Sequence, residues 1–135
     1  MLAKITVADY MTKRLVMLNP EMNVIDAIEL LLEHSITCAP VLDAQGHFKG
    51  MFSEIDGMKL VLESVYDRGM SGKVGDYMTV DTMSVDAATS IVDLAEKLQP
   101  SFVRSFPVFK DNELVGMISR SDILKALVAV ASKAQ

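Results

Sequence analysis

The stretch GMISRSD at residues 116–122 decides the fold, because a near copy of it, GMFSEID, stands at residues 50–56. Both stretches contain glycine and methionine, then a hydrophobic residue and a serine, with an aspartate three places after the serine. Self-similarity at a fixed spacing indicates that one structural unit is used more than once. The chain is therefore interpreted as a duplicated unit.

The duplication covers most of the 135 residues. VADYMT at 7–12 returns as VGDYMT at 74–79, and the same offset relates Pro40 to Pro107. The offset falls by one after the turn that reads DAQGH in the first copy and KDNE in the second, and polar turns tolerate insertions best. The chain divides into a first repeat, a linker and a second repeat, at residues 7–66, 67–73 and 74–131.

Each copy is predicted to begin with a strand and a helix. VML at 16–18 is a short extended run in the first copy. Apolar residues at helical spacing then predict a helix over 24–32 in the first copy and over 91–98 in the second, where Pro100 ends it.

A β-hairpin and a second helix complete each copy. CAPVL and FKGMF flank a glycine-containing turn in the first copy, and FPVF and LVGMI flank KDNE in the second, which is typical of hairpins. The helix after each hairpin carries an apolar stripe, which consists of Ile55, Met58, Leu62 and Val65 in the first copy and of Leu124, Leu127, Val128 and Ala131 in the second.

Two such units can cover each other. A unit of roughly 60 residues with a small sheet is only marginally stable alone, because too little of its surface can be buried. We expect an α+β fold in which two β-α-β-β-α units are related by a pseudo-two-fold axis. Such an axis creates two equivalent clefts between the copies.

Composition and charge limit the classes of function. Hydrophobic residues make up 50% of the chain and charged residues 23%, as in a packed globular protein. The formal net charge of −5 disfavours nucleic acid as a partner, because binding phosphates needs a basic face. The single cysteine, Cys38, and the lack of a long apolar stretch predict a cytoplasmic protein with no membrane contact and no metal site.

The Ser-x-x-Asp pattern has two interpretations. A serine at a helix start caps free backbone N–H groups, and an acidic residue in the first turn interacts favourably with the helix dipole, so that no ligand is needed. However, each pattern follows a strand glycine, which indicates that another backbone or a ligand comes close. Ala39 and Phe106 also precede prolines, whose missing N–H leaves nearby main-chain groups free for another partner.

Together these features suit a nucleoside. Each cleft would combine an apolar wall, a hydroxyl and a carboxylate, which come from Met51, Phe52, Ser53 and Asp56 in one copy and from Met117, Ile118, Ser119 and Asp122 in the other. An aspartate at a helix start repels phosphate, so we expect both carboxylates to accept hydrogen bonds from ribose hydroxyls.

The order, spacing and duplication of DYMT, the Ala-Pro-Val or Phe-Pro-Val strand and GMxSxxD resemble the paired cystathionine β-synthase (CBS) domain, or Bateman module. The resemblance covers residues 5–130. It implies a strand-helix-strand-strand-helix unit per copy and a module that often binds AMP, ADP, ATP or S-adenosylmethionine as a regulatory ligand. Modules of this kind commonly regulate an attached or associated protein.

The resemblance also implies roles for six residues of the motifs. It makes Asp56 and Asp122 ribose ligands and places the hydroxyls of Ser53 and Ser119 near the ribose or phosphate. The threonine of each DYMT motif would approach the site of the other copy, which would bring Thr12 to Asp122 and Thr79 to Asp56.

The two clefts differ in charge. Glu54 in the first motif corresponds to Arg120 in the second, and Thr37 corresponds to Arg104. Arginine binds phosphate through paired hydrogen bonds, whereas glutamate repels it. We expect the second cleft to prefer a phosphorylated ligand, and the first to be empty or to take an uncharged or cationic adenosyl group. Gly57, a weak helix former, also sets the first site apart.

Three classes of function remain open. The first is a stand-alone regulatory module that binds an adenosine-containing ligand and has a protein effector. The second is a structural module, in which the motif residues only cap helices and exposed methionine-rich helix faces drive homodimerisation or docking to a partner. An enzyme is the weakest, because no nucleophile stands beside a base and no phosphate loop occurs. A fragment of a larger enzyme, transporter or channel also fits.

Overall fold

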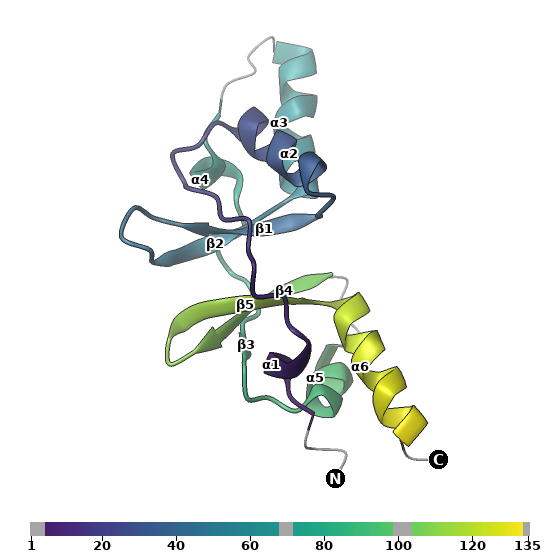
Figure 1. The fold of residues 1–135 in the computed structure, drawn as a ribbon. Coiled ribbons are helices and arrows are strands. Elements are labelled where there is room, and N and C mark those ends of the chain that lie inside the picture. Colours follow the sequence, from purple (N-terminus) through teal and green to yellow (C-terminus); the bar gives the residue numbers. More distant parts are fainter. Residues whose placement is uncertain (1–4, 68–71, 99–103, 134–135) are drawn as a thin grey trace. The chain divides into compact units, whose positions relative to one another are not determined.

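The computed structural model describes residues 5–67, 72–98 and 104–133 and contains two compact units (Figure 1). The Asp56 unit comprises Leu15–Thr82. The Asp122 unit comprises Met1–Arg14 together with Met83–Gln135. Each unit therefore combines the body of one sequence repeat with the opening segment of the other.

The Asp56 unit is built on a two-stranded antiparallel sheet. Its elements are α2 (Val24–Glu33), β1 (Cys38–Leu42), β2 (Phe48–Ser53), α3 (Glu54–Asp67) and α4 (Val74–Tyr77). The predicted hairpin is confirmed as β1 and β2, and the predicted helix as α2, which Asn23 caps by accepting a hydrogen bond from the Ile25 N–H (2.8 Å). One hydrophobic core unites these elements and includes Val24, Leu31, Phe52, Leu60 and Val74.

The predicted first strand at 16–18 is reduced to one bridge. Leu18 forms a parallel bridge with Val41, in which its N–H donates to Pro40 O (2.9 Å) and its carbonyl accepts from the Leu42 N–H (2.8 Å). The chain then turns at Asn19, whose side chain accepts from the Glu21 N–H (2.8 Å). The turn ends the pairing after Leu18.

The Asp122 unit is built on a three-stranded sheet of order β3-β4-β5. Its elements are α1 (Val7–Tyr10), β3 (Val85–Asp86), α5 (Ile91–Leu98), β4 (Ser105–Lys110), β5 (Glu113–Ser119) and α6 (Arg120–Lys133). β3 runs parallel to β4, and β4 and β5 form the second predicted hairpin. The core includes Val7, Ile91, Leu94, Phe106 and Ile118. Pro100, predicted to end α5, lies outside the described residues.

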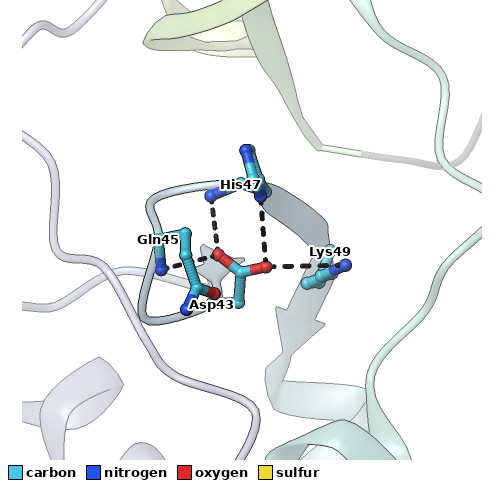
Figure 2. Close-up of polar contacts among 4 residues, drawn as sticks. All are labelled: Asp43, Gln45, His47 and Lys49. Carbon is cyan, nitrogen blue, oxygen red and sulfur yellow. Dashed lines mark hydrogen bonds and ion pairs between the residues drawn. The ribbon is translucent and has the colours of Figure 1, made fainter.

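The two hairpin turns explain the one-residue difference between the copies. In β4-β5, Asp111 and Asn112 both have left-handed backbone angles (φ 52° and 67°), as a two-residue hairpin turn requires. In β1-β2 the longer turn is organised by the Asp43 carboxylate, which accepts from the backbone N–H groups of Gln45 (3.0 Å) and His47 (2.8 Å) (Figure 2). The His47 N–H is the main cause that lowers the pKa of Asp43 below its ordinary value.

The helices after the hairpins expose the stripe that the sequence analysis singled out. On α3 the core-facing residues are Gly57 and Leu60, and on α6 they are Ile123, Ala126 and Val130. The stripe residues of α3 are all exposed, as are Leu124, Val128 and Ala131 of α6, whereas Leu127 is half-buried. Each helix thus has two apolar faces, and a period of 3.6 residues does not tell which one is buried.

Gly57 has a packing role. A Cβ atom at this position would lie 2.8 Å from Cγ1 of Ile28 on α2, so the glycine lets α2 approach α3. The corresponding residues of the Asp122 unit are Ala95 on α5 and Ile123 on α6, with the sizes reversed. The weak helix former is therefore explained by the neighbouring helix.

Candidate ligand-binding site

Each DYMT threonine forms a backbone pair with the methionine of the other copy's GMxSxxD motif. Thr79 N–H donates to Met51 O (2.8 Å), and Met51 N–H donates to Thr79 O (2.9 Å). Thr12 N–H donates to Met117 O (2.7 Å), and Met117 N–H donates to Thr12 O (3.0 Å). The two threonines thus lie beside β2 and β5 near the points where α3 and α6 begin.

The strand glycines make this approach possible. A Cβ atom on Gly50 would lie 2.5 Å from Thr79 O, and one on Gly116 would lie 2.8 Å from Thr12 O and 2.7 Å from the sulfur of Met11. The sequence left open whether a backbone or a ligand approaches these glycines. The structure shows that a backbone does.

The Ser-x-x-Asp residues cap the helices that follow. Ser53 N–H donates to Asp56 Oδ2 (2.9 Å), and Asp56 N–H donates to Ser53 Oγ (3.2 Å). In the other copy Ser119 N–H donates to Asp122 Oδ2 (2.9 Å), and Asp122 N–H donates to Ser119 Oγ (3.1 Å). These reciprocal bonds fix both carboxylates at the helix starts, whether or not they also bind a ligand.

The two carboxylates differ in how far the protein already satisfies them. Asp56 is only 7% exposed; Ser53 Oγ–H also donates to its Oδ2 (3.1 Å), and Thr79 Oγ1–H donates to its Oδ1 (3.4 Å). The structure therefore brings Thr79 to Asp56 through their side chains. Asp122 is half-buried, and Thr12 enters its neighbourhood through the backbone pair with Met117. The second carboxylate is the more accessible of the two.

Most of the expected apolar wall belongs to the cores. The side chains of Ala39 and Phe52 in one copy and of Phe106 and Ile118 in the other are at most 1% exposed and lie in the core clusters. Met51 is buried as well, whereas Met117 is half-buried. Of these side chains, Met117 is accessible to a ligand, whereas the core residues pack inside the two units.

The two arginines of the second copy are neighbours. Arg120 N–H donates to Arg104 O (2.9 Å), just as Glu54 N–H donates to Thr37 O (2.9 Å) in the first copy. The Arg104 side chain is exposed. The Arg120 guanidinium donates from Nη2 to Leu98 O (3.1 Å), at the end of α5, where helix carbonyls lack intrahelical partners. The residue that follows Ser119 is therefore basic, and the residue that follows Ser53 is acidic.

Two polar contacts that the sequence did not indicate hold α4 in place. Tyr77 OH donates to Glu63 Oε2 on α3 (2.8 Å), which is the main cause that raises the pKa of Tyr77. Lys73 Nζ donates to Glu21 Oε2 (2.6 Å), which is the main cause that raises the pKa of Lys73. Their partners are distant in sequence, so no local pattern could have revealed them.

Two properties of the described residues concern metal binding and membrane insertion. In the ranges 5–67, 72–98 and 104–133, no group of three or more His, Cys, Asp or Glu side chains is placed to hold a metal ion. Within the same ranges, no helix has both the length and the apolar character needed to cross a bilayer.

Known proteins share this architecture. The CBS domain family model matches residues 7–63 and 74–129. The CBS domain-containing protein CBSX1, chloroplastic, of Arabidopsis thaliana is 30% identical to this chain over 93% of its length. The CBS domain-containing protein CBSX2, chloroplastic, of the same plant is also 30% identical over 93% of this chain. The chain spans less than two thirds of the length of these two plant proteins, 65% and 64%.

Solved structures agree with this match. CBSX2 in complex with AMP has a TM-score of 0.79 and 31% identity, covering 93% of this chain and 98% of that one. The CBS domain pair of protein MJ0100, in complex with 5′-methylthioadenosine and S-adenosyl-L-methionine, has a TM-score of 0.79 over 93% and 97% of the chains, and its 19% identity shows the fold alone. The resemblance inferred from the sequence is thus confirmed: the chain belongs to the CBS domain family and contains two copies of that domain.

Proposed function

We propose that the chain is a regulatory module that binds an adenosine-containing ligand beside Asp122. The observation that carries this proposal is the Asp122 carboxylate, which Ser119 holds at the start of α6 while it remains partly exposed. A carboxylate in this position can accept two hydrogen bonds from the adjacent hydroxyls of a ribose. The match at 31% identity to CBSX2, solved with AMP, supports this choice of ligand class.

We assign roles to the residues around Asp122 that remain accessible. Thr12 and Ser119 would supply hydroxyls, and the accessible Met117 would contact the base. The exposed Arg104, with Arg120 beside it, favours AMP, ADP or ATP over S-adenosylmethionine at this site, because a guanidinium attracts phosphate and repels a sulfonium. Asp56, which the protein already satisfies, makes the first site the weaker one, suited at most to an uncharged or cationic adenosyl group.

The ligand would act by shifting an equilibrium. A regulatory ligand changes a protein only if it binds one arrangement more tightly than another. The output of this module would be its affinity for a protein effector rather than a reaction of its own.

We propose the cytoplasm as the location of the protein.

A thermal-shift panel of adenosine, AMP, ADP, ATP and S-adenosylmethionine tests the proposal. A ligand at 100 times its Kd should stabilise the folded protein by about 2.7 kcal/mol. We expect Asp122→Ala to abolish this stabilisation by AMP and to lower the unliganded stability by about 0.5–2 kcal/mol, the usual cost of a lost cap.

Asn23→Ala is the matched control, because it also removes a helix cap, but at the start of α2. It should cost a similar stability and keep the full response to AMP. If no adenosyl compound stabilises the wild type, or if Asp122→Ala responds like the wild type, the ligand-binding function is wrong.

A second candidate function is homodimerisation, which the exposed apolar residues of α3 and α6 favour. Monomeric proteins rarely leave contiguous apolar faces open to water. We propose that these faces associate with a second copy of the chain, with or without the ligand. Sedimentation velocity over a range of concentrations would show whether the wild type dimerises.

A further inference from the structure

The opening segments of the two copies, residues 5–12 and 72–79, are attached to their units by the same backbone hydrogen bonds. Besides the threonine–methionine pairs, these bonds are Val7 N–H to Thr89 O, Ala8 N–H to Ala87 O and Ile91 N–H to Ile5 O for one segment, and Val74 N–H to Met22 O, Gly75 N–H to Pro20 O and Val24 N–H to Gly72 O for the other, all at 2.9 Å. Val7 and Val74 are both fully buried. The main chain thus holds the two segments alike.

Side chains add three further hydrogen bonds between residues 72–79 and the rest of the Asp56 unit. These bonds are Lys73 Nζ to Glu21 Oε2 (2.6 Å), Tyr77 OH to Glu63 Oε2 (2.8 Å) and Thr79 Oγ1 to Asp56 Oδ1 (3.4 Å). They reach α4 at its start, at its end and just beyond it. This segment is therefore tied along its whole length.

The equivalent positions of the Asp122 unit lack all three bonds. The repeat relates Lys73 and Glu21 to Thr6 and Ala88, Tyr77 and Glu63 to Tyr10 and Ala129, and Thr79 and Asp56 to Thr12 and Asp122. Thr6 Oγ1–H donates to Asp9 Oδ2 within its own segment (3.2 Å). In the part of the chain that the structure describes, the hydroxyl groups of Tyr10 and Thr12 have no hydrogen-bond partner, and Thr12 is exposed.

We propose that residues 5–12 undock from the Asp122 unit more readily than residues 72–79 undock from the Asp56 unit, and that a ligand beside Asp122 keeps them docked by bonding to Thr12. This inference rests on the proposed function and names the segment that the ligand would control. Segments with the fewest stabilising contacts open first, and ligand-binding elements are drawn from them. The ligand would give Thr12 the kind of bond that Asp56 gives Thr79. It would thereby bind the docked arrangement more tightly than the undocked one, as a regulatory ligand must.

The three side-chain bonds set the size of the expected difference. A typical hydrogen bond changes an opening equilibrium by a factor of about two to ten. The Lys73–Glu21 pair contributes least, because both side chains are exposed and surface ion pairs are weak. The Tyr77–Glu63 bond contributes more, because a charged acceptor strengthens it. Together they should make undocking of residues 5–12 at least about tenfold more frequent.

Amide hydrogen exchange of the full chain, followed by NMR, measures this difference. The N–H groups of Thr12 and Thr79 donate to the carbonyl oxygens of Met117 and Met51, so they exchange when their segments undock. Each amide lies between a methionine and a threonine side chain, which gives the two nearly the same intrinsic exchange rate. We expect Thr12 to exchange at least about tenfold faster than Thr79, and faster than the amides of the β4-β5 hairpin.

Glu63→Ala tests the role of the side-chain bonds, because it removes the acceptor of Tyr77 and copies Ala129 of the other unit. It should speed the exchange of Thr79 by about two- to tenfold and leave that of Thr12 unchanged. Glu29→Ala is the matched control, since it removes an exposed glutamate of α2. It should change neither rate. A Glu63→Ala protein in which Thr79 exchanges as in the wild type would show that these bonds do not hold the segment.

The ligand step is tested by repeating the exchange with saturating AMP. The exchange of Thr12 should slow to about that of the β4-β5 hairpin, while that of Thr79 stays the same. Equal rates for Thr12 and Thr79 without ligand, or a faster Thr79, would reject the undocking. If AMP stabilises the protein in the thermal-shift panel but leaves the Thr12 rate unchanged, the link between ligand and undocking is wrong and the proposed function stands. If no adenosyl compound stabilises the protein, the proposed function and the link are both wrong, and the rates without ligand still decide whether residues 5–12 undock.

Discussion

Gly50 and Gly116 are the residues that let the two threonine backbones lie against the strands. Both belong to the motif that first suggested a duplication, and both face a carbonyl oxygen of the opposite DYMT segment. Both copies have glycine at this position because a threonine carbonyl oxygen lies where a side chain would otherwise stand. The site that we propose depends on them indirectly, because they bring Thr12 and Thr79 into place.

Gly50→Ala should destabilise the protein by about 1–3 kcal/mol, as overpacking of a tight contact usually does. Its new methyl group would lie 2.5 Å from Thr79 O, a main-chain atom that cannot move without breaking the pair with Met51. Urea unfolding measures the change in the free energy of unfolding. Gly116→Ala should also destabilise the protein but cost less, because its methyl group would lie 2.8 Å from the main-chain Thr12 O, compared with 2.5 Å for Gly50, and the Met11 side chain beside it can move. A Gly50→Ala protein as stable as the wild type would contradict this account.

Helices α2 and α3 fit together through a pair of residues whose sizes are complementary. Ile28 on α2 fills the space that Gly57 leaves on α3. In the other copy the pair is Ala95 on α5 and Ile123 on α6, and both pack in or against the core. At these corresponding positions, the larger side chain is on the first helix in one unit and on the second helix in the other.

A double-mutant cycle tests this complementarity. Gly57→Ile alone should destabilise by about 1–3 kcal/mol through overpacking, and Ile28→Ala alone by about 2–5 kcal/mol through a cavity. The double variant, which copies the Ala95 and Ile123 arrangement, should cost less than the sum by about 0.5–3 kcal/mol. The measurement is the free energy of unfolding in urea. Strict additivity would mean that the two side chains do not share one space.

The whole chain is organised by exchange of its opening segments. Val7, Tyr10 and Met11 pack with the core of the Asp122 unit, whereas Val74 and Tyr77 pack with the core of the Asp56 unit. The structural units are therefore not the sequence repeats. A fragment cut at the repeat boundaries loses part of its core, while a fragment cut at the unit boundaries keeps it.

Fragment 15–82, which corresponds to the Asp56 unit, should accordingly unfold cooperatively in urea. Fragment 7–66, which corresponds to the first repeat, should be markedly less stable. It lacks Val74, which is fully buried, and Tyr77, which bonds to Glu63. Circular dichroism during urea titration measures both transitions. Equal or greater stability of the 7–66 fragment would show that the exchanged segments do not stabilise the units.

The sequence alone determined the duplication, the two hairpins, the helices that follow them and the family. These features depend on local chemistry, such as the alternation of strand residues, the turn at Asp111 and Asn112, and the Ser-x-x-Asp caps, which neighbouring residues specify by themselves. The resemblance also pointed to the meeting of Thr79 with Asp56, which residue spacing would not reveal.

Only the tertiary structure decided what each face and each glycine contacts. Helical periodicity marks two apolar faces on α3 and cannot tell that Leu60 lies in the core while Leu62 faces water. It also gives no sign that Gly57 makes room for Ile28 or that Tyr77 bonds to Glu63. The physical reason is that packing depends on residues far apart in the chain, whose contacts become defined only when the elements assemble.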